Sequence, residues 1–318
     1  MSTTPNANPT AIPGLHHVTA ISGPPQANLD FYVRDLGQRL VKRTVNFDDP
    51  GTYHLYYGDR DAAPGSILTF FPFVDAGPGR AGAGMASAFA YAVADLDAWM
   101  GRLASSAIDF EGPFERLGER AIALNDPDGL RVEIIEGGAR DDGFHSVTLW
   151  LDEIEATERV LGVMGYEREA DESVATGGTG GQGTANERRV RWRVPEATRG
   201  AVVDLITSDA RSIGRPGAGT IHHVAFRAPQ PDDQRAWRER LAEAGMDVTP
   251  VIDRQYFDAI YFRTPGGVLF EIATDPPGFA VDEDERHLGE ALKLPAQYEP
   301  HRGRIERVLP ALRLPPAA

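Results

Sequence analysis

The feature that most constrains the fold is a pattern that recurs four times along the 318 residues. Each copy opens with a strand-like segment, continues with an amphipathic helix that stops at glycine, and returns through strands rich in Val, Ile, Leu and Phe. The four openings are LHHVTAISG (15–23), ASAFAYAV (86–93), FHSVTLWLD (144–152) and TIHHVAFRAP (220–229). This pattern predicts four βαβββ modules, at residues 14–74, 85–138, 143–208 and 219–276.

One module cannot bury the apolar face of its own sheet, so two modules must lay their sheets side by side. The sequence therefore predicts an α+β protein of two domains, an N-terminal domain (1–139) and a C-terminal domain (140–318) that ends in an extension (277–318). The two are expected to join near GGARDDG (137–143). The glycine-rich stretch TGGTGGQGTAN (176–186) is expected to be a mobile hairpin loop without a phosphate role, because no strand feeds it into a helix.

Composition removes several classes of function. The chain has no cysteine, so a metal ion must be held by His, Asp or Glu. A net charge of −15 and scattered Lys and Arg argue against nucleic acid as a partner. No apolar run is long enough for a bilayer, and MSTTPNANPTAIPG (1–14) resembles a short flexible arm and not a secretory signal, so a cytoplasmic protein without membrane association is expected.

Adjacent histidines open the first and the fourth modules, His16-His17 and His222-His223. Because side chains alternate along a strand, one imidazole of each pair should face the concave side of the sheet and the other should point away or to the rim. One histidine from each pair can then reach a common centre. The fourth module also carries Glu271 inside an apolar strand, GGVLFEIA, where an unpaired carboxylate would be costly without a compensating cation.

Two imidazoles and one carboxylate on one face of a metal ion are the ligand set of non-haem Fe(II) enzymes that activate O2. Zinc hydrolases also use three protein ligands, so ligand type alone leaves the metal open. Taken singly, a histidine on a strand is usually a hydrogen-bonded core or rim residue, and a buried glutamate usually pairs with an arginine. Two His-His pairs at the same point of two modules, with a glutamate on the closing strand of one, favour a metal site instead.

Other histidines are weaker candidates. His145 opens the third module and Asp204 lies in its closing strand, but the second module opens without an imidazole, so the second and third modules are expected to form a vestigial, structural pair. His54 alternates with aromatic residues, which suits either the wall of a cavity or the surface. His287 and His301 lie in the charged C-terminal segment and are expected to be solvated.

These segments resemble the vicinal oxygen chelate superfamily, which includes glyoxalase I, bleomycin-resistance proteins and extradiol ring-cleaving dioxygenases. Over nearly the whole chain, LHHVT, GQRLVKRTVNFDDPGTYHLYYGD, GSILTFFPF, IHHVAF, YFRTPGGVLFEIATDPPGF and VDEDERHLGEALKLP resemble the hydroquinone-specific ring-cleaving dioxygenases. The resemblance implies Fe(II) bound by His17, His223 and Glu271. It also implies a substrate pocket lined by His16, Thr19, His222, Arg254 and Tyr261.

The activity that the resemblance implies is the opening of a hydroquinone-type aromatic diol by O2, with Fe(II) as the cofactor and Mn(II) or Zn(II) as alternatives in the purified protein. His222 and Tyr261 are expected to move protons, and Arg254 suits a developing anion. His16 and Thr19 are expected to contact the substrate. Around Arg254, IDRQYFDAIYF departs from the chlorohydroquinone enzymes, which puts halogenated substrates in doubt. Assembly into a homo-oligomer is left open.

Three alternatives remain. A catechol extradiol dioxygenase would use the same triad. A glyoxalase-type isomerase or lyase commonly draws a carboxylate from both paired modules, but the first module closes with SILTFF (66–71) and supplies no acid. A metal-free module that binds aromatic ligands would not need two imidazoles and a carboxylate to converge.

Overall fold

The computed structural model describes residues 11–138, 143–176, 185–209 and 212–314. Most of the expected N-terminal arm, of the join near residues 137–143 and of the glycine-rich loop lies outside these residues. In the described ranges, none of the helices combines the length and the apolar character that a membrane span requires.

All four modules contain the predicted strand, helix and return strands. The first contains β1 (Leu15–Ser22), α1 (Pro25–Leu29), a π-helical turn (Asp30–Asp35), β2 (Arg39–Val45), β3 (Tyr53–Gly58) and β4 (Ile67–Pro72). The second contains β5 (Met85–Val93), α2 (Leu96–Ser105), β6 (Glu111–Arg116), β7 (Glu119–Asn125) and β8 (Arg131–Glu136). The third contains β9 (Gly143–Trp150), α3 (Glu155–Val163), β10 (Glu167–Thr176), β11 (Ala185–Arg193) and β12 (Val202–Ser208). The fourth contains β13 (Thr220–Ala228), α4 (Pro231–Glu243), β14 (Ile252–Asp253), β15 (Phe257–Arg263) and β16 (Leu269–Pro277).

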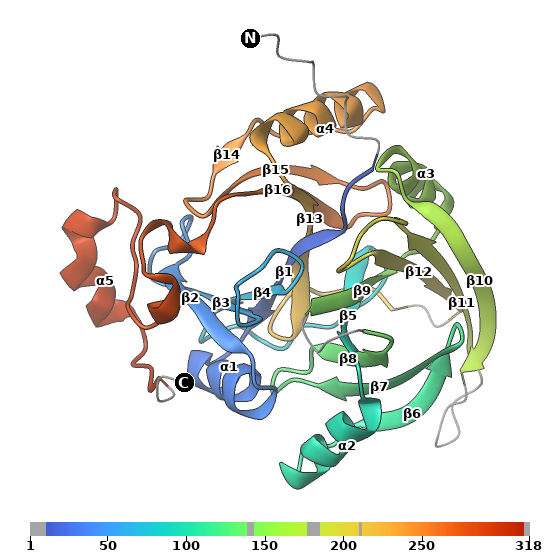
Figure 1. Ribbon diagram of the computed structural model, residues 1–318, viewed down its shortest axis with the longest axis horizontal. Coiled ribbons are helices and arrows are strands. Elements are labelled where there is room, and N and C mark those ends of the chain that lie inside the picture. The colour runs from blue at the N-terminus through green and yellow to red at the C-terminus, as the bar shows by residue number, and fades with distance from the viewer. Residues whose placement is uncertain (1–10, 139–142, 177–184, 210–211, 315–318) are drawn as a thin grey trace.

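The modules pair as first with fourth and second with third. One curled sheet has the strand order β14-β15-β16-β13-β1-β4-β3-β2, and the other has the order β10-β11-β12-β9-β5-β8-β7-β6. In Figure 1 the blue strands of the first module accordingly lie beside the orange strands of the fourth. The division at residues 139 and 140 expected from the sequence therefore does not follow the sheets, because each sheet combines one module from either half of the chain.

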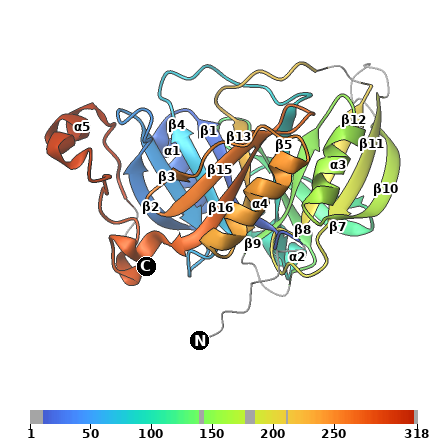
Figure 2. The same cartoon turned by 90° about the horizontal axis from the view of Figure 1, so that it is seen from above.

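Each sheet is joined at its centre by the opening strands of its two modules. β1 pairs antiparallel with β13, and β5 pairs antiparallel with β9. The segments that leave the first module and enter the fourth also run together, with Gly79 N donating to Ala218 O at 2.8 Å and Arg80 N donating to Arg215 O at 2.8 Å. Figure 2 shows the two sheets side by side as the halves of one body.

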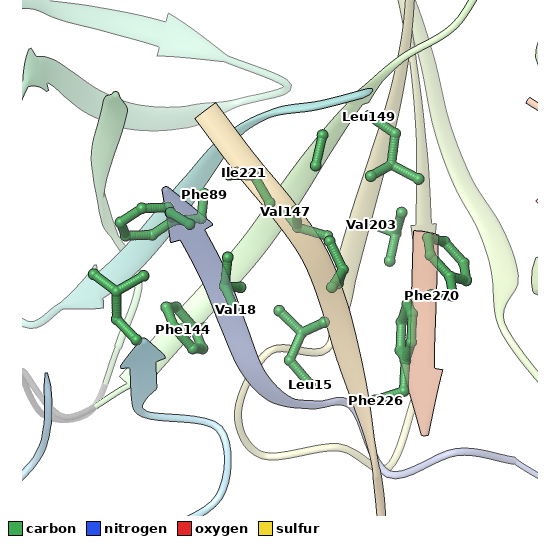
Figure 3. Packing of buried hydrophobic residues seen from close by; sticks show 14 of the residues in the cluster. Leu15, Val18, Phe89, Phe144, Val147, Leu149, Val203, Ile221, Phe226 and Phe270 are labelled. Atoms are coloured by element: carbon green, nitrogen blue, oxygen red, sulfur yellow. The ribbon is translucent and has the colours of Figure 1, made fainter. Parts of the chain in front are cut away.

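The main apolar core lies between the two sheets. Its central side chains come from the opening strands of the modules and from β12 and β16, and ten of them are labelled in Figure 3: Leu15, Val18, Phe89, Phe144, Val147, Leu149, Val203, Ile221, Phe226 and Phe270. These positions alternate with the residues that face the opposite side of each sheet. On β1 and β13 the core thus uses one face and leaves the other for His17 and His223.

The C-terminal extension covers the open edge of the first sheet. It contains three 3-10 turns (Phe279–Val281, Glu285–His287 and Glu299–His301) and α5 (Arg302–Val308). The buried amine of Lys42 on the edge strand β2 donates to Asp282 at 2.7 Å, and Arg43 forms a parallel bridge with Leu292. Phe279 packs into an apolar cluster with Tyr56, Tyr256 and Phe257, so the extension helps to wall the concave face of this sheet.

Candidate metal centre

The three predicted metal ligands converge on the first sheet. His17 lies on β1, His223 on β13 and Glu271 on β16, and these strands are adjacent. The Nε2 atoms of the two histidines are 3.3 Å apart, and they lie 3.5 Å and 2.9 Å from one oxygen of Glu271. Ligand atoms bound to one ion at about 2.1 Å lie about 3.0–3.4 Å from one another, so these separations suit a shared ion. Among the described residues, no other group of three His, Asp or Glu has ligand atoms within 4.8 Å of one another.

The electrostatics of the three ligands also fit a divalent cation. Glu271 is 0% exposed, and neither of its oxygens makes a well-oriented hydrogen bond within the described part of the chain. Burial opposes ionisation of Glu271, but His17 and His223 outweigh it and hold its pKa well below the usual range. Burial lowers the pKa of His223, which keeps that imidazole neutral and able to donate its lone pair.

The first histidine of each pair lies against the candidate ligand histidine that follows it. The Nδ1 atoms of His16 and His17 are 2.9 Å apart, and those of His222 and His223 are 2.8 Å apart. Strand alternation had suggested that the partners would diverge, but both rings of each pair turn toward each other. His16 is 2% exposed and packs on Phe257, and burial followed by the charge of His17 lowers its pKa to about 3. His222 is exposed.

A chain of hydrogen bonds extends from β1 across the first module. The Oγ1 atoms of Thr19 and Thr69 are 2.9 Å apart, Thr69 Oγ1 lies 2.8 Å from His54 Nε2, and the Tyr56 hydroxyl lies 2.9 Å from His54 Nδ1. His54 also packs on Phe71. The sequence left His54 undecided and missed Tyr56 and Thr69, although the alternation in Tyr53-His54-Leu55-Tyr56 does place His54 and Tyr56 on one face of β3.

Arg254 and Tyr261 lie together beside the candidate ligands. The Arg254 Nε donates to the Tyr261 hydroxyl at 3.2 Å, and the guanidinium lies 5.4 Å from the centre of the Tyr261 ring. Its Nη1 also approaches the exposed Asp48 at 3.4 Å. Tyr261 is the cross-strand neighbour of Glu271, and its ring meets that of His223 edge-on at 5.9 Å. Burial and then the charge of Glu271 raise the pKa of Tyr261, so its hydroxyl stays protonated at neutral pH.

The first module has no counterpart of Glu271. On β13 and β16, Ala225 pairs with Glu271, and at the same register on β1 and β4, Thr19 pairs with Thr69. Thr69 therefore occupies the position from which a second carboxylate would reach the ion. Its hydroxyl is engaged with Thr19, so within the described residues the candidate ligands at this centre are two imidazoles and one carboxylate.

The second sheet contains a degenerate copy of the same arrangement. Ala90 on β5 pairs with Glu133 on β8, which repeats the pairing of Ala225 with Glu271. Glu133 is thus the structural counterpart of Glu271. It is buried as well.

The register of β5 with β9 repeats that of β13 with β1, so that Ser146 takes the place of His17 and Ala88 takes the place of His223. Neither residue has an imidazole to offer. The prediction that the second and third modules form a structural pair without a complete ligand set agrees with this register.

A guanidinium group occupies the corresponding position in the second sheet. Arg116 is buried and forms an ion pair with Glu133, donates to Ser146 Oγ at 3.3 Å and approaches Asp204 at 3.5 Å. His145, one of the weaker candidates from the sequence, lies 3.0 Å from the carboxylate of Glu119. The ionised carboxylates here are therefore neutralised by side chains of the protein.

The chain resembles known proteins over most of its length. A Bacillus subtilis (strain 168) protein named "Putative ring-cleaving dioxygenase MhqO" is 44% identical over 315 residues, which cover 93% of this chain and 95% of that protein. A Sphingobium indicum protein named "Chlorohydroquinone/hydroquinone 1,2-dioxygenase" is 33% identical over 315 residues, covering 92% of this chain and 94% of that protein.

Solved structures also resemble this chain. A "putative dioxygenase" from Bacillus subtilis has a TM-score of 0.86 at 42% identity and covers 96% of this chain and 99% of its own. Maize glyoxalase I has a TM-score of 0.62 at 14% identity, covering 82% of this chain and 92% of its own, and shares the fold alone. The model of one family matches residues 14–134 and 154–272, which include parts of all four modules. The chain belongs to the Glyoxalase/Bleomycin resistance protein/Dioxygenase superfamily.

Proposed function

We propose that this protein is an Fe(II)-dependent ring-cleaving dioxygenase that opens hydroquinone-type aromatic diols with O2. The observation that carries the proposal is the convergence of His17, His223 and Glu271 at a centre where Thr69 stands in place of a fourth ligand. Three protein ligands leave room for both a substrate oxygen and O2. The names of the relatives, which include ring-cleaving and hydroquinone dioxygenases, point to the same chemistry.

Bound Fe(II) would supply the one-electron chemistry with O2 that amino-acid side chains lack. The protein's own contribution would be to hold the ion and to orient its ligands. His17 and His223 must present unprotonated Nε2 atoms to the ion, so each Nδ1 carries the proton. The Nδ1 atoms of His16 and His222 are at hydrogen-bond distance to accept those protons and to fix both ligand rings.

The substrate would meet polar groups on two sides. His222 is exposed, and because its Nδ1 accepts from His223, its Nε2 carries the ring proton and can donate it to an oxygen of the substrate. The protonated Tyr261 hydroxyl can donate one. Arg254 is placed to attract the anion of an ionised diol or of the carboxylate product. Thr19 lies at the inner end of the chain that leads through Thr69 to His54.

A glyoxalase-type isomerase is the second candidate, because it shares the fold and needs only Lewis-acid chemistry. The threonine at position 69 argues against it. A catechol dioxygenase would use the same three ligands. The proposed partners are thus a small aromatic diol and O2, and a cytoplasmic location suits them.

The test is anaerobic reconstitution with Fe(II), followed by O2 uptake and product analysis with hydroquinone, methylhydroquinone and catechol. We expect one O2 consumed per ring opened, with hydroquinone or methylhydroquinone preferred. The zinc form should be inert, because zinc has no redox chemistry. Equal turnover by the zinc form would contradict the proposal and favour the isomerase, whereas a clear preference for catechol would correct only the substrate.

A further inference from the structure

The two sheets place an arginine at the same point relative to their buried glutamates. On the second sheet, Ala123 of β7 pairs with Glu133, and two strand positions away Ala121 pairs with Phe114 on β6. Arg116 follows Phe114 by two residues. Its guanidinium reaches back onto Glu133.

The first sheet repeats this register. Tyr261 of β15 pairs with Glu271, and Ala259 pairs with Ile252 on β14. Arg254 follows Ile252 by two residues, so Arg254 is the counterpart of Arg116. A side chain of the same length starts from the same position, and it can therefore reach Glu271.

Arg254 does not occupy that position in the structure. Its Nε donates to the Tyr261 hydroxyl at 3.2 Å, and its guanidinium lies over the Tyr261 ring. The residue that corresponds to Tyr261 in the second sheet is Ala123, which offers neither a ring nor a hydroxyl. In the first sheet, where Tyr261 is present, the guanidinium of Arg254 lies away from Glu271. In the second sheet, where alanine takes the place of the tyrosine, the guanidinium of Arg116 lies on Glu133.

We infer that Tyr261 is a positioning residue that holds Arg254 away from Glu271, and that Arg254 is a built-in cation that competes with the metal ion for this carboxylate. The inference rests on the metal site of the proposed function. A buried carboxylate without a partner strongly favours any cation that can reach it. Without Tyr261, Arg254 would move onto Glu271 as Arg116 lies on Glu133, and the metal would have to displace it.

The size of the effect follows from competition between the two cations. If Arg254 occupied the site in nine molecules of ten, the apparent dissociation constant for the metal would rise about tenfold. Removal of Arg254 would abolish that rise. A role of Tyr261 in packing alone would not be reversed by removing Arg254.

The experiment measures the affinity of the metal-free protein for Mn(II) by titration calorimetry in four proteins: wild type, Tyr261→Ala, Arg254→Met and the double variant. Tyr261→Ala should bind Mn(II) at least about tenfold more weakly than wild type. The double variant should return to the affinity of Arg254→Met, which should be no weaker than that of wild type. Circular dichroism and thermal melting check that each variant is folded, and Tyr261→Leu replaces Tyr261→Ala if the alanine variant is not.

An unchanged affinity of Tyr261→Ala, or a double variant as weak as Tyr261→Ala, would overturn the inference. Either result would leave the metal site itself in place. If the wild-type protein bound no Mn(II), Fe(II) or Zn(II), the proposed metal centre would fail first, and this inference would fail with it.

Discussion

Replacing Arg116 by methionine should destabilise the protein strongly. The side chains of Arg116 and Glu133 are 6% and 5% exposed, so the substitution leaves a buried carboxylate whose remaining ion-pair partner is the more exposed Arg131, at 3.3 Å. Breaking a buried pair from one side costs about 3–5 kcal/mol, and the contact with Arg131 favours the lower end, about 3 kcal/mol. For a chain of this size that is a fall in melting temperature of about 4–5 °C.

The assay is urea unfolding of the metal-free protein followed by circular dichroism. The double variant Arg116→Met/Glu133→Met should recover most of the lost stability, because a buried pair can be replaced by apolar side chains at little cost. Arg120→Met, which removes surface pairs with Asp97 and Glu136, serves as the matched control and should leave the midpoint nearly unchanged. A loss below about 1 kcal/mol for Arg116→Met, or a double variant as unstable as the single one, would refute the view that Arg116 neutralises this site.

Three further outcomes are expected. Replacing any of the three proposed metal ligands by alanine should abolish metal binding in a folded protein, measured by metal analysis after dialysis, while His145→Ala keeps its metal; the reverse pattern would mean that the wrong modules carry the site. His222→Ala should retain its iron and lower kcat by roughly 10²-fold, the usual range for loss of an acid or base; full activity at saturating substrate would remove this role. Burial alone would raise the pKa of Asp204, but Arg191, Arg116 and Arg189 hold it at about 2, below its ordinary 3.8, so its contribution to stability is present above about pH 4 and lost toward pH 2. As the pH is lowered from 6 to 2, the urea midpoint should fall less steeply in Asp204→Asn than in wild type. Equal slopes would contradict the view that ionised Asp204 stabilises the fold.

Much of the fold could be predicted because each module carries its own signals. The apolar strands, the helices that end at glycine and the repeated His-His opening are local features, and the structure has all four modules. The convergence of His17, His223 and Glu271 followed from the same repeat and is confirmed as geometry. Their role as metal ligands stays a prediction.

The partnership of the modules followed from the histidine pairs and not from sequence order. The His-His openings joined the first module to the fourth and left the second with the third, in agreement with the pairing of β1 with β13 and β5 with β9, whereas the division at the middle of the chain does not follow the sheets. The local sequence of a strand does not determine which distant strand it will pair with. The role of Arg116 could not be predicted either, because FERLGER (114–120) has the composition of an ordinary charged turn. Only the register of β6, β7 and β8 brings Arg116 to Glu133.

The nesting of the second and third modules between the first and the fourth has a consequence for the order of synthesis. His17 and His223 are separated by 206 positions, so a ribosome that adds about 5–20 residues per second needs about 10–40 s between them. The strands of the inner sheet have all been synthesised before the fourth module begins. A chain that ends before the fourth module therefore carries only one of the three proposed metal ligands, His17, and the proposed metal site can form only when the outer sheet closes.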